Sequence, residues 1–249
     1  MAGEPRVTVV PDYAAMSRRA AEIVAEVVSQ SPAATIAVPT GSTPLGMFDE
    51  LIGMVKSNDL DFAHTQIFCL DEYLGVTRDD PNSLTGWLWK AFLGPAGIPS
   101  RHVHAIDTAD PDPEAAAARY EQTLIGLGGL ELAVLGLGPN GHIAYNEPGS
   151  SADTRTRAVN LTPQSIAQAS AYWENTIPIP SRAMTIGVGT LLEARRIVLI
   201  VSGSDKAGIL HRALNEPMSA DVPASWLRLA GERFDVIADE AAMSERTEM

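Results

Sequence analysis

Short apolar runs that alternate with stretches of helical periodicity constrain the fold of this chain more than any other feature. The runs occupy residues 7–10, 35–38, 66–70, 132–135, 184–188, 197–201 and 236–238. Between them lie amphipathic stretches such as residues 12–30, where apolar side chains recur at helical spacing. Buried strands that alternate with helices predict an α/β fold of modified Rossmann type, with a mostly parallel sheet and helices on both of its faces.

The chain shows no sign of division into several domains. It has 249 residues, of which 45% are hydrophobic and 20% charged, which is ordinary for a globular protein. We find no Gly/Ser-rich linker, low-complexity tract or internal repeat. The sequence therefore predicts one domain over residues 1–249, with a core from about 7 to 240.

Charge and cysteine content narrow the function classes. A formal net charge of −13 argues against a nucleic-acid partner and against binding to anionic membranes. No apolar run approaches the roughly 18 residues of a membrane span. The single cysteine, Cys69, lies in an apolar run and predicts a buried thiol in a cytoplasmic protein. The oligomeric state stays open, and a homo-oligomer is compatible with the sequence.

The stretch after residues 132–135 is the first candidate for a functional site. Three glycines within six residues follow this run, and Asn140, His142 and Glu147 come next. A strand, a glycine turn and a polar cluster together are typical of a site at the carboxyl end of a strand in an open α/β sheet. The alternative is a plain turn with a hydrogen-bonded histidine, and spacing alone does not separate the two.

Three other loops also follow apolar runs. Gly41, Ser42 and Thr43 offer backbone N–H groups and hydroxyls at a helix start, which suits a phosphate; an ordinary hydroxyl cap is the alternative. Asp71 could be a general base or part of a solvated turn, and Lys206 a phosphate ligand or a surface lysine. Because parallel strands end at a shared edge, we expect these groups to lie close together.

Seven stretches of the chain carry a resemblance to a known family. They run in order from about residue 35 to 226 and comprise Pro39–Pro44, Leu70–Gly75, Asn140–Pro148, Ser150–Ser151, Arg155–Arg157, Ala183–Gly189 and Ser202–Ala207. In these stretches the chain resembles glucosamine-6-phosphate deaminases, which share a fold group with 6-phosphogluconolactonases. Asn-Glu-Pro after Gly-His, and Asp-Glu-Tyr rather than Asp-Glu-Arg, favour the deaminase branch.

The resemblance implies that glucosamine 6-phosphate and water become fructose 6-phosphate and ammonium, without a metal or an organic cofactor. His142, oriented by Glu147 and Asn140, would open the pyranose ring. Asp71 would move a proton from C2 to C1. The same family pattern implies that the 41–43 loop and Lys206 hold the phosphate of this small-molecule partner.

The sequence departs from the family pattern at three positions. Asn140 stands where some members have Asp. Ala171 stands where the family has an arginine that clamps the phosphate, a loss of roughly 1.5–3 kcal/mol unless another arginine such as Arg182 replaces it. Val159 replaces a lysine found in members activated by an amino-sugar phosphate, so we expect no such activation.

Other functions remain as alternatives. Galactosamine-6-phosphate deamination and lactone hydrolysis would use a similar site. A non-catalytic sugar-phosphate sensor is a further alternative, because this fold also serves as the effector domain of some transcription regulators. A strand that begins near Val7, with no preceding DNA-binding helices, and the charge of −13 argue against the sensor.

Overall fold

This computed structural model describes residues 4–172 and 178–244. The strands are β1 (Arg6–Val10), β2 (Thr35–Val38), β3 (Gln66–Cys69), β4 (Asp71–Tyr73), β5 (Val103–His104), β6 (Leu132–Gly136), β7 (Arg157–Asn160), β8 (Arg182–Thr185), β9 (Arg196–Val201) and β10 (Phe234–Asp239). The α-helices are α1 (Tyr13–Gln30), α2 (Leu45–Lys56), α3 (Leu84–Leu88), α4 (Pro113–Gly126), α5 (Pro163–Tyr172), α6 (Val188–Leu192), α7 (Ala207–Asn215) and α8 (Glu240–Met243). Shorter helical turns span Trp89–Leu93, Ser100–His102, Ser204–Lys206 and Pro223–Arg233.

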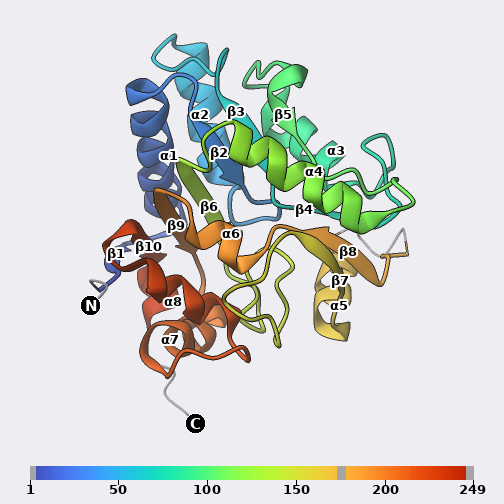
Figure 1. The fold of residues 1–249 in the computed structure, drawn as a ribbon. Coiled ribbons are helices and arrows are strands. Elements are labelled where there is room, and N and C mark those ends of the chain that lie inside the picture. The colour runs from blue at the N-terminus through green and yellow to red at the C-terminus, as the bar shows by residue number, and fades with distance from the viewer. Residues whose placement is uncertain (1–3, 173–177, 245–249) are drawn as a thin grey trace.

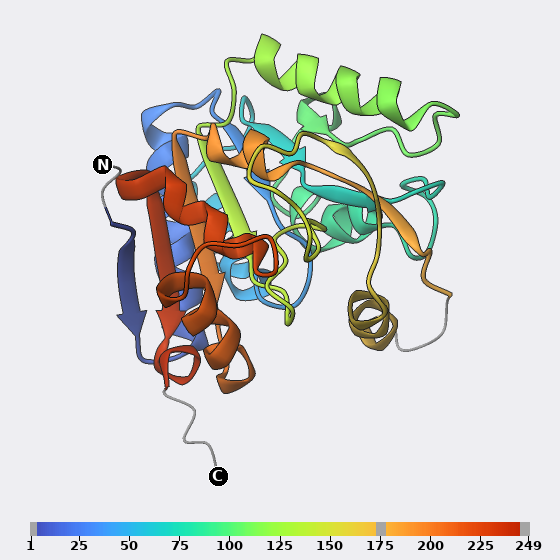
Figure 2. The same ribbon diagram turned by 60° about the horizontal axis from the view of Figure 1, so that its bottom comes forward.

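Seven strands form a parallel sheet in the order β1-β10-β9-β6-β2-β3-β5. Figure 2 shows β1 at one edge, beside the red strand β10. The chain builds outward from β2 through β3 to β5, and then returns to place β6 on the other side of β2. The strand order therefore reverses between β2 and β6, and such a reversal is where open α/β sheets form their ligand crevice.

Helices cover both faces of this sheet, as the sequence predicts (Figure 1). Alternate strand residues belong to two different cores: Ile36 and Val38 pack with α1 and α2, whereas Ala37 between them packs on the side of α4, α6 and α7. Because successive side chains of a strand point to opposite faces, a strand buried on both faces must be apolar throughout. The uninterrupted apolar runs of the sequence have this origin.

Most helix starts follow their sequence signals. Asp12, Ser83 and Asp112 each accept a hydrogen bond from a backbone N–H in the first turn of α1, α3 and α4, respectively. The start of α2 differs from the expectation, because Pro44 is its N-cap residue and no side chain of the preceding loop caps it. Cys69 is buried, as predicted.

A second, smaller sheet was not predicted. Its three antiparallel strands have the order β4-β8-β7. The predicted strand 184–188 is wrong in its bounds: β8 covers Arg182–Thr185, and Val188 already begins α6. The chain turns at Gly187, where a Cβ atom would come within 2.1 Å of the Thr154 carbonyl oxygen. In the described part of the chain, no helix is both long and apolar enough to cross a membrane.

Candidate active site

A cavity of about 440 Å³ opens at the carboxyl ends of β2, β3, β6 and β9. It is lined by residues from every loop that the sequence singles out, namely Gly41, Ser42, Thr43, Asp71, His142 and Lys206. These residues are up to 165 positions apart in the sequence, and the reversal of strand order between β2 and β6 brings them together. Asn140 and Glu147 are not among the lining residues and contact His142 from behind.

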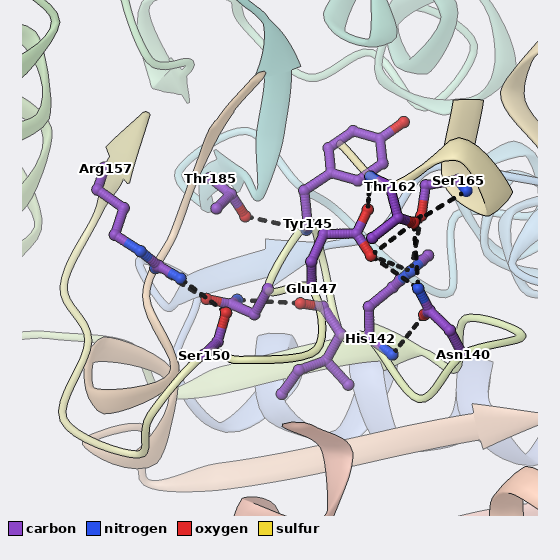
Figure 3. Close-up of polar contacts among 11 residues, drawn as sticks. Asn140, His142, Tyr145, Glu147, Ser150, Arg157, Thr162, Ser165 and Thr185 are labelled. Atoms are coloured by element: carbon purple, nitrogen blue, oxygen red, sulfur yellow. Dashed lines mark hydrogen bonds and ion pairs between the residues drawn. The ribbon is translucent and has the colours of Figure 1, made fainter. Parts of the chain in front are cut away.

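Glu147 faces the ring of His142 (Figure 3). Its Oε2 lies 3.6 Å from Nδ1, an ion-pair distance too long for a hydrogen bond, and the Ser165 hydroxyl lies 3.3 Å from the same nitrogen. With Nδ1 turned toward Glu147, Nε2 is the ring nitrogen left for a ligand. Asn140 braces the pair, because its Nδ2 donates to Glu147 (2.8 Å) and its Oδ1 accepts from the His142 backbone N–H (3.1 Å).

Glu147 is held as a carboxylate although its side chain is buried. Burial alone would raise its pKa, but hydrogen bonds from the surrounding groups outweigh that effect and lower the pKa to about 2. Two of the donors are the backbone N–H of Thr162 (3.1 Å) and its hydroxyl (3.2 Å). This ionised carboxylate lies beside Nδ1 of His142, so it fixes the orientation of the imidazole ring and leaves Nε2 for a ligand.

Sequence reasoning missed Thr162 and Ser165. The Thr162 hydroxyl accepts the Ser165 backbone N–H (3.2 Å) at the start of α5, in addition to donating to Glu147. A threonine followed by proline ahead of an amphipathic stretch is a helix-start signal, so the cap was readable from the sequence. Its contact with Glu147, 15 residues away, was not.

Asp71 is the first residue of β4 and is 7% exposed. Burial and the charge of Glu72 raise its pKa to about 7. A carboxyl group with this pKa changes its protonation near neutral pH and can both accept and return a proton. The adjacent pair of acids is not a solvated turn, since both side chains are buried.

Glu72 has a structural role. Its carboxylate accepts hydrogen bonds from the Ser83 hydroxyl (2.7 Å) and from the backbone N–H groups of Leu84 (3.0 Å) and Thr85 (2.9 Å). It thereby satisfies donors at the start of α3. Next to Asp71, the cavity wall carries two tyrosines that were also missed, Tyr73 and Tyr145, whose hydroxyl oxygens lie 2.9 Å apart.

The far end of the cavity suits an anion. The 41–43 loop turns at Gly41, whose φ of 102° is a conformation that glycine adopts without strain. Lys206 ends the short helical turn after Gly203, and burial lowers the pKa of its ammonium group. Asp239 fixes this turn by accepting hydrogen bonds from the Ser202 hydroxyl and the Gly203 N–H.

The chain matches known proteins over most of its length. Residues 12–236 match the model of the family described as glucosamine-6-phosphate isomerases/6-phosphogluconolactonase. The chain belongs to this family. A glucosamine-6-phosphate deaminase of Thermoanaerobacter pseudethanolicus is 35% identical over 237 residues, which cover 95% of this chain and 94% of the relative.

Solved structures of the family share the fold. A monomeric glucosamine-6-phosphate deaminase matches with a TM-score of 0.90 and 33% identity, over 95% of this chain and 98% of the other. A 6-phosphogluconolactonase from Trypanosoma cruzi matches with a TM-score of 0.76 over 100% of this chain and 99% of the other. At 21% identity, the second match shows the common fold alone.

The departures from the family pattern expected from the sequence can be located in the structure. Position 171 lies in the last turn of α5, and its side chain is outside the described part of the structure. Arg182 does not replace the family arginine in the cavity. It lies on β8 and lines a separate cleft of about 1110 Å³ between α4 and the small sheet, which contains none of the predicted site residues. Among the described lining residues, Lys206 is therefore the only lysine or arginine in the site cavity.

Val159, the third departure, is on β7 and packs beside the small apolar cluster around Tyr73. The neighbouring Arg157 is engaged internally. Its guanidinium donates to the Asn146 side chain (2.9 Å). It also donates to the Ser150 hydroxyl (2.9 Å), as Figure 3 shows. Asn146 in turn donates to the backbone carbonyl of Ile143, so Arg157 helps to fix the loop that carries His142 and Glu147.

Proposed function

We propose that this protein is a glucosamine-6-phosphate deaminase, which converts glucosamine 6-phosphate and water into fructose 6-phosphate and ammonium. The observation that carries the proposal is one cavity that combines three elements. These are a carboxyl group that titrates near pH 7, an imidazole backed by an ionised carboxylate, and an anion-binding end. The 35% identity to the T. pseudethanolicus deaminase over nearly the whole chain supports the same activity.

The reaction begins with ring opening. The imidazole of His142 transfers a proton from the anomeric hydroxyl to the ring oxygen, and the C1–O5 bond breaks to leave an aldehyde at C1. Glu147 stabilises the charged imidazole during this transfer, and Asn140 holds Glu147 in place.

Isomerisation and loss of ammonia follow. The Asp71 carboxylate removes the proton from C2, the aldehyde oxygen gains a proton from the ammonium group on C2, and an enolamine forms. Asp71 then returns its proton to C1, which leaves an iminium group at C2. Water adds to C2, the C–N bond breaks, and ammonia leaves as ammonium while C2 becomes the ketone of fructose 6-phosphate. Asp71 must be ionised to start this step, which its pKa of about 7 permits.

The phosphate would sit between the 41–43 loop and Lys206. The loop supplies backbone N–H groups and two hydroxyls, and Lys206 supplies charge. The proposal places the enzyme in the cytoplasm, in keeping with a single, buried cysteine.

The test is ammonia release by the purified protein from glucosamine 6-phosphate, galactosamine 6-phosphate and unphosphorylated glucosamine. We expect selective release from the first, and none when Asp71→Asn is assayed at an unchanged melting temperature. Release mainly from galactosamine 6-phosphate would reassign the substrate. No release by the folded wild type from any of the three would refute the deaminase proposal.

A further inference from the structure

The 41–43 loop is held in place by a side chain from another helix, Tyr13 at the start of α1. The Tyr13 hydroxyl donates to the backbone carbonyl of Ser42 (3.3 Å) and accepts the backbone N–H of Gly46 (2.8 Å). Tyr13 itself does not line the cavity and is 38% exposed. It therefore contacts the loop from outside the cavity.

This contact replaces the cap that α2 lacks. Pro44 is the N-cap residue, makes no side-chain cap bond, and leaves the first N–H groups of α2 without partners in their own helix. Tyr13 satisfies the N–H of Gly46, and the Ser42 carbonyl accepts that of Leu45 (3.3 Å). Glycine at position 46 allows the approach, because a Cβ atom there would come within 2.4 Å of the Ser17 hydroxyl and 3.1 Å of the Tyr13 ring.

The hydrogen bonds at Ser42 also set the direction of the next amide. In a trans peptide the C=O of one residue and the N–H of the following residue point in opposite directions. The Ser42 carbonyl is fixed on the α1 side by two donors, Tyr13 and Leu45. The N–H of Thr43 is thereby turned away from α1, and Thr43 lines the cavity.

We propose that Tyr13 is a positioning residue that holds the 41–43 loop in its anion-binding conformation; this inference rests on the proposed function. The loop matters more here than in a site with two cationic side chains, because Lys206 is the only lysine or arginine among the described lining residues. If a loop amide turns away from the phosphate, no second cationic side chain among these residues compensates for the lost hydrogen bond.

The test compares Tyr13→Phe with the wild type. The substitution removes one oxygen from a partly exposed residue and keeps the ring. Binding of inorganic phosphate is measured by calorimetry, and KM and kcat with glucosamine 6-phosphate. We expect the phosphate Kd and the KM to rise together by about three- to tenfold, the effect of losing one or two hydrogen bonds, with kcat within about twofold of the wild type.

Ser57→Ala is the matched control. The Ser57 hydroxyl at the other end of the same helix lies within hydrogen-bond distance of the carbonyls of Gly53 (3.2 Å) and Met54 (3.1 Å) and of the Asp59 carboxylate (2.5 Å), so this variant also loses one hydroxyl from an end of α2. We expect an unchanged phosphate Kd. A second variant, Gly46→Ala, keeps the hydroxyl but forces α1 and α2 apart, and it should weaken phosphate binding as Tyr13→Phe does.

Unchanged phosphate binding in Tyr13→Phe would overturn the inference, as would an equal loss in Ser57→Ala or a fall in kcat at constant KM. A wild type that binds no phosphate would also overturn it. If the wild type binds phosphate and Tyr13→Phe weakens that binding, but no sugar phosphate is turned over, the positioning role stands and the deaminase proposal fails.

Discussion

Gly138→Ala should disable the enzyme by displacing its histidine. Gly138 follows β6, and a Cβ atom at this position would lie 2.2 Å from both Nε2 and Cδ2 of the His142 ring. Ordinary van der Waals contact begins at 3.4 Å, so the ring must move by about 1.2 Å. The ring is also held at Nδ1, which lies 3.3 Å from the Ser165 hydroxyl and 3.6 Å from the Glu147 carboxylate, so moving the ring disturbs these contacts.

The expected effect is large on catalysis and small on folding. A misplacement of about 1 Å in a reacting group costs roughly 100-fold in rate. We therefore expect kcat for ammonia release to fall by about two orders of magnitude, while the Kd for inorganic phosphate stays within about twofold because Lys206 and the 41–43 loop are untouched. The φ of Gly138 is not positive, so alanine adds no backbone strain.

Gly53→Ala, in α2 and outside the cavity, is the control. A Cβ atom at Gly53 would meet no atom within 4 Å, and its φ is also not positive. This variant should keep a kcat close to that of the wild type. The reasoning is refuted if Gly138→Ala retains more than about a third of the wild-type kcat, or if the two variants lose activity equally.

Three further predictions concern pH, charge and regulation. Burial and Glu72 raise the pKa of Asp71 to about 7, and the proposed base must be ionised. We therefore expect kcat/KM to fall about tenfold per pH unit below about pH 7. A flat pH–rate profile from pH 5 to 8 would exclude Asp71 as the base. Lys206→Ala should raise the KM for glucosamine 6-phosphate by roughly 10- to 100-fold with kcat little changed. An unchanged KM in steady-state assays would show that the phosphate does not bind at Lys206. With valine at position 159, adding a second amino-sugar phosphate should leave the dependence of rate on substrate concentration unchanged, and activation by this compound would contradict the prediction.

Much of the fold was predictable because it depends on local patterns. Strands buried on both faces must be apolar throughout, and helices between them must be apolar on one side, so both leave a clear signal. The clustering of the candidate site residues was predictable for a related reason, because parallel strands that end at one edge bring their following loops together. Asp71, His142 and Lys206 were grouped on this basis, and they line one cavity.

The features that sequence reasoning missed depend on contacts across long separations. The strands of the small sheet have three or four residues each and no distinctive alternation. The hydroxyl-cap alternative for the 41–43 loop failed because the cap comes from Tyr13, 33 positions before Gly46. Arg182 was considered as a phosphate ligand because it is near position 171 in sequence, but β8 carries it to a different cleft.

Strand β4 gives its two adjacent acids different surroundings. Asp71 and Tyr73 face the cavity, whereas Glu72 between them faces the start of α3. Only Leu70 separates β3 from β4. Insertion or deletion of a single residue at this junction would turn β4 over. Glu72 would then face the cavity, and Asp71 would face α3. The length of this junction is therefore as strict a requirement as the identity of Asp71, and chimeras made between relatives must conserve both.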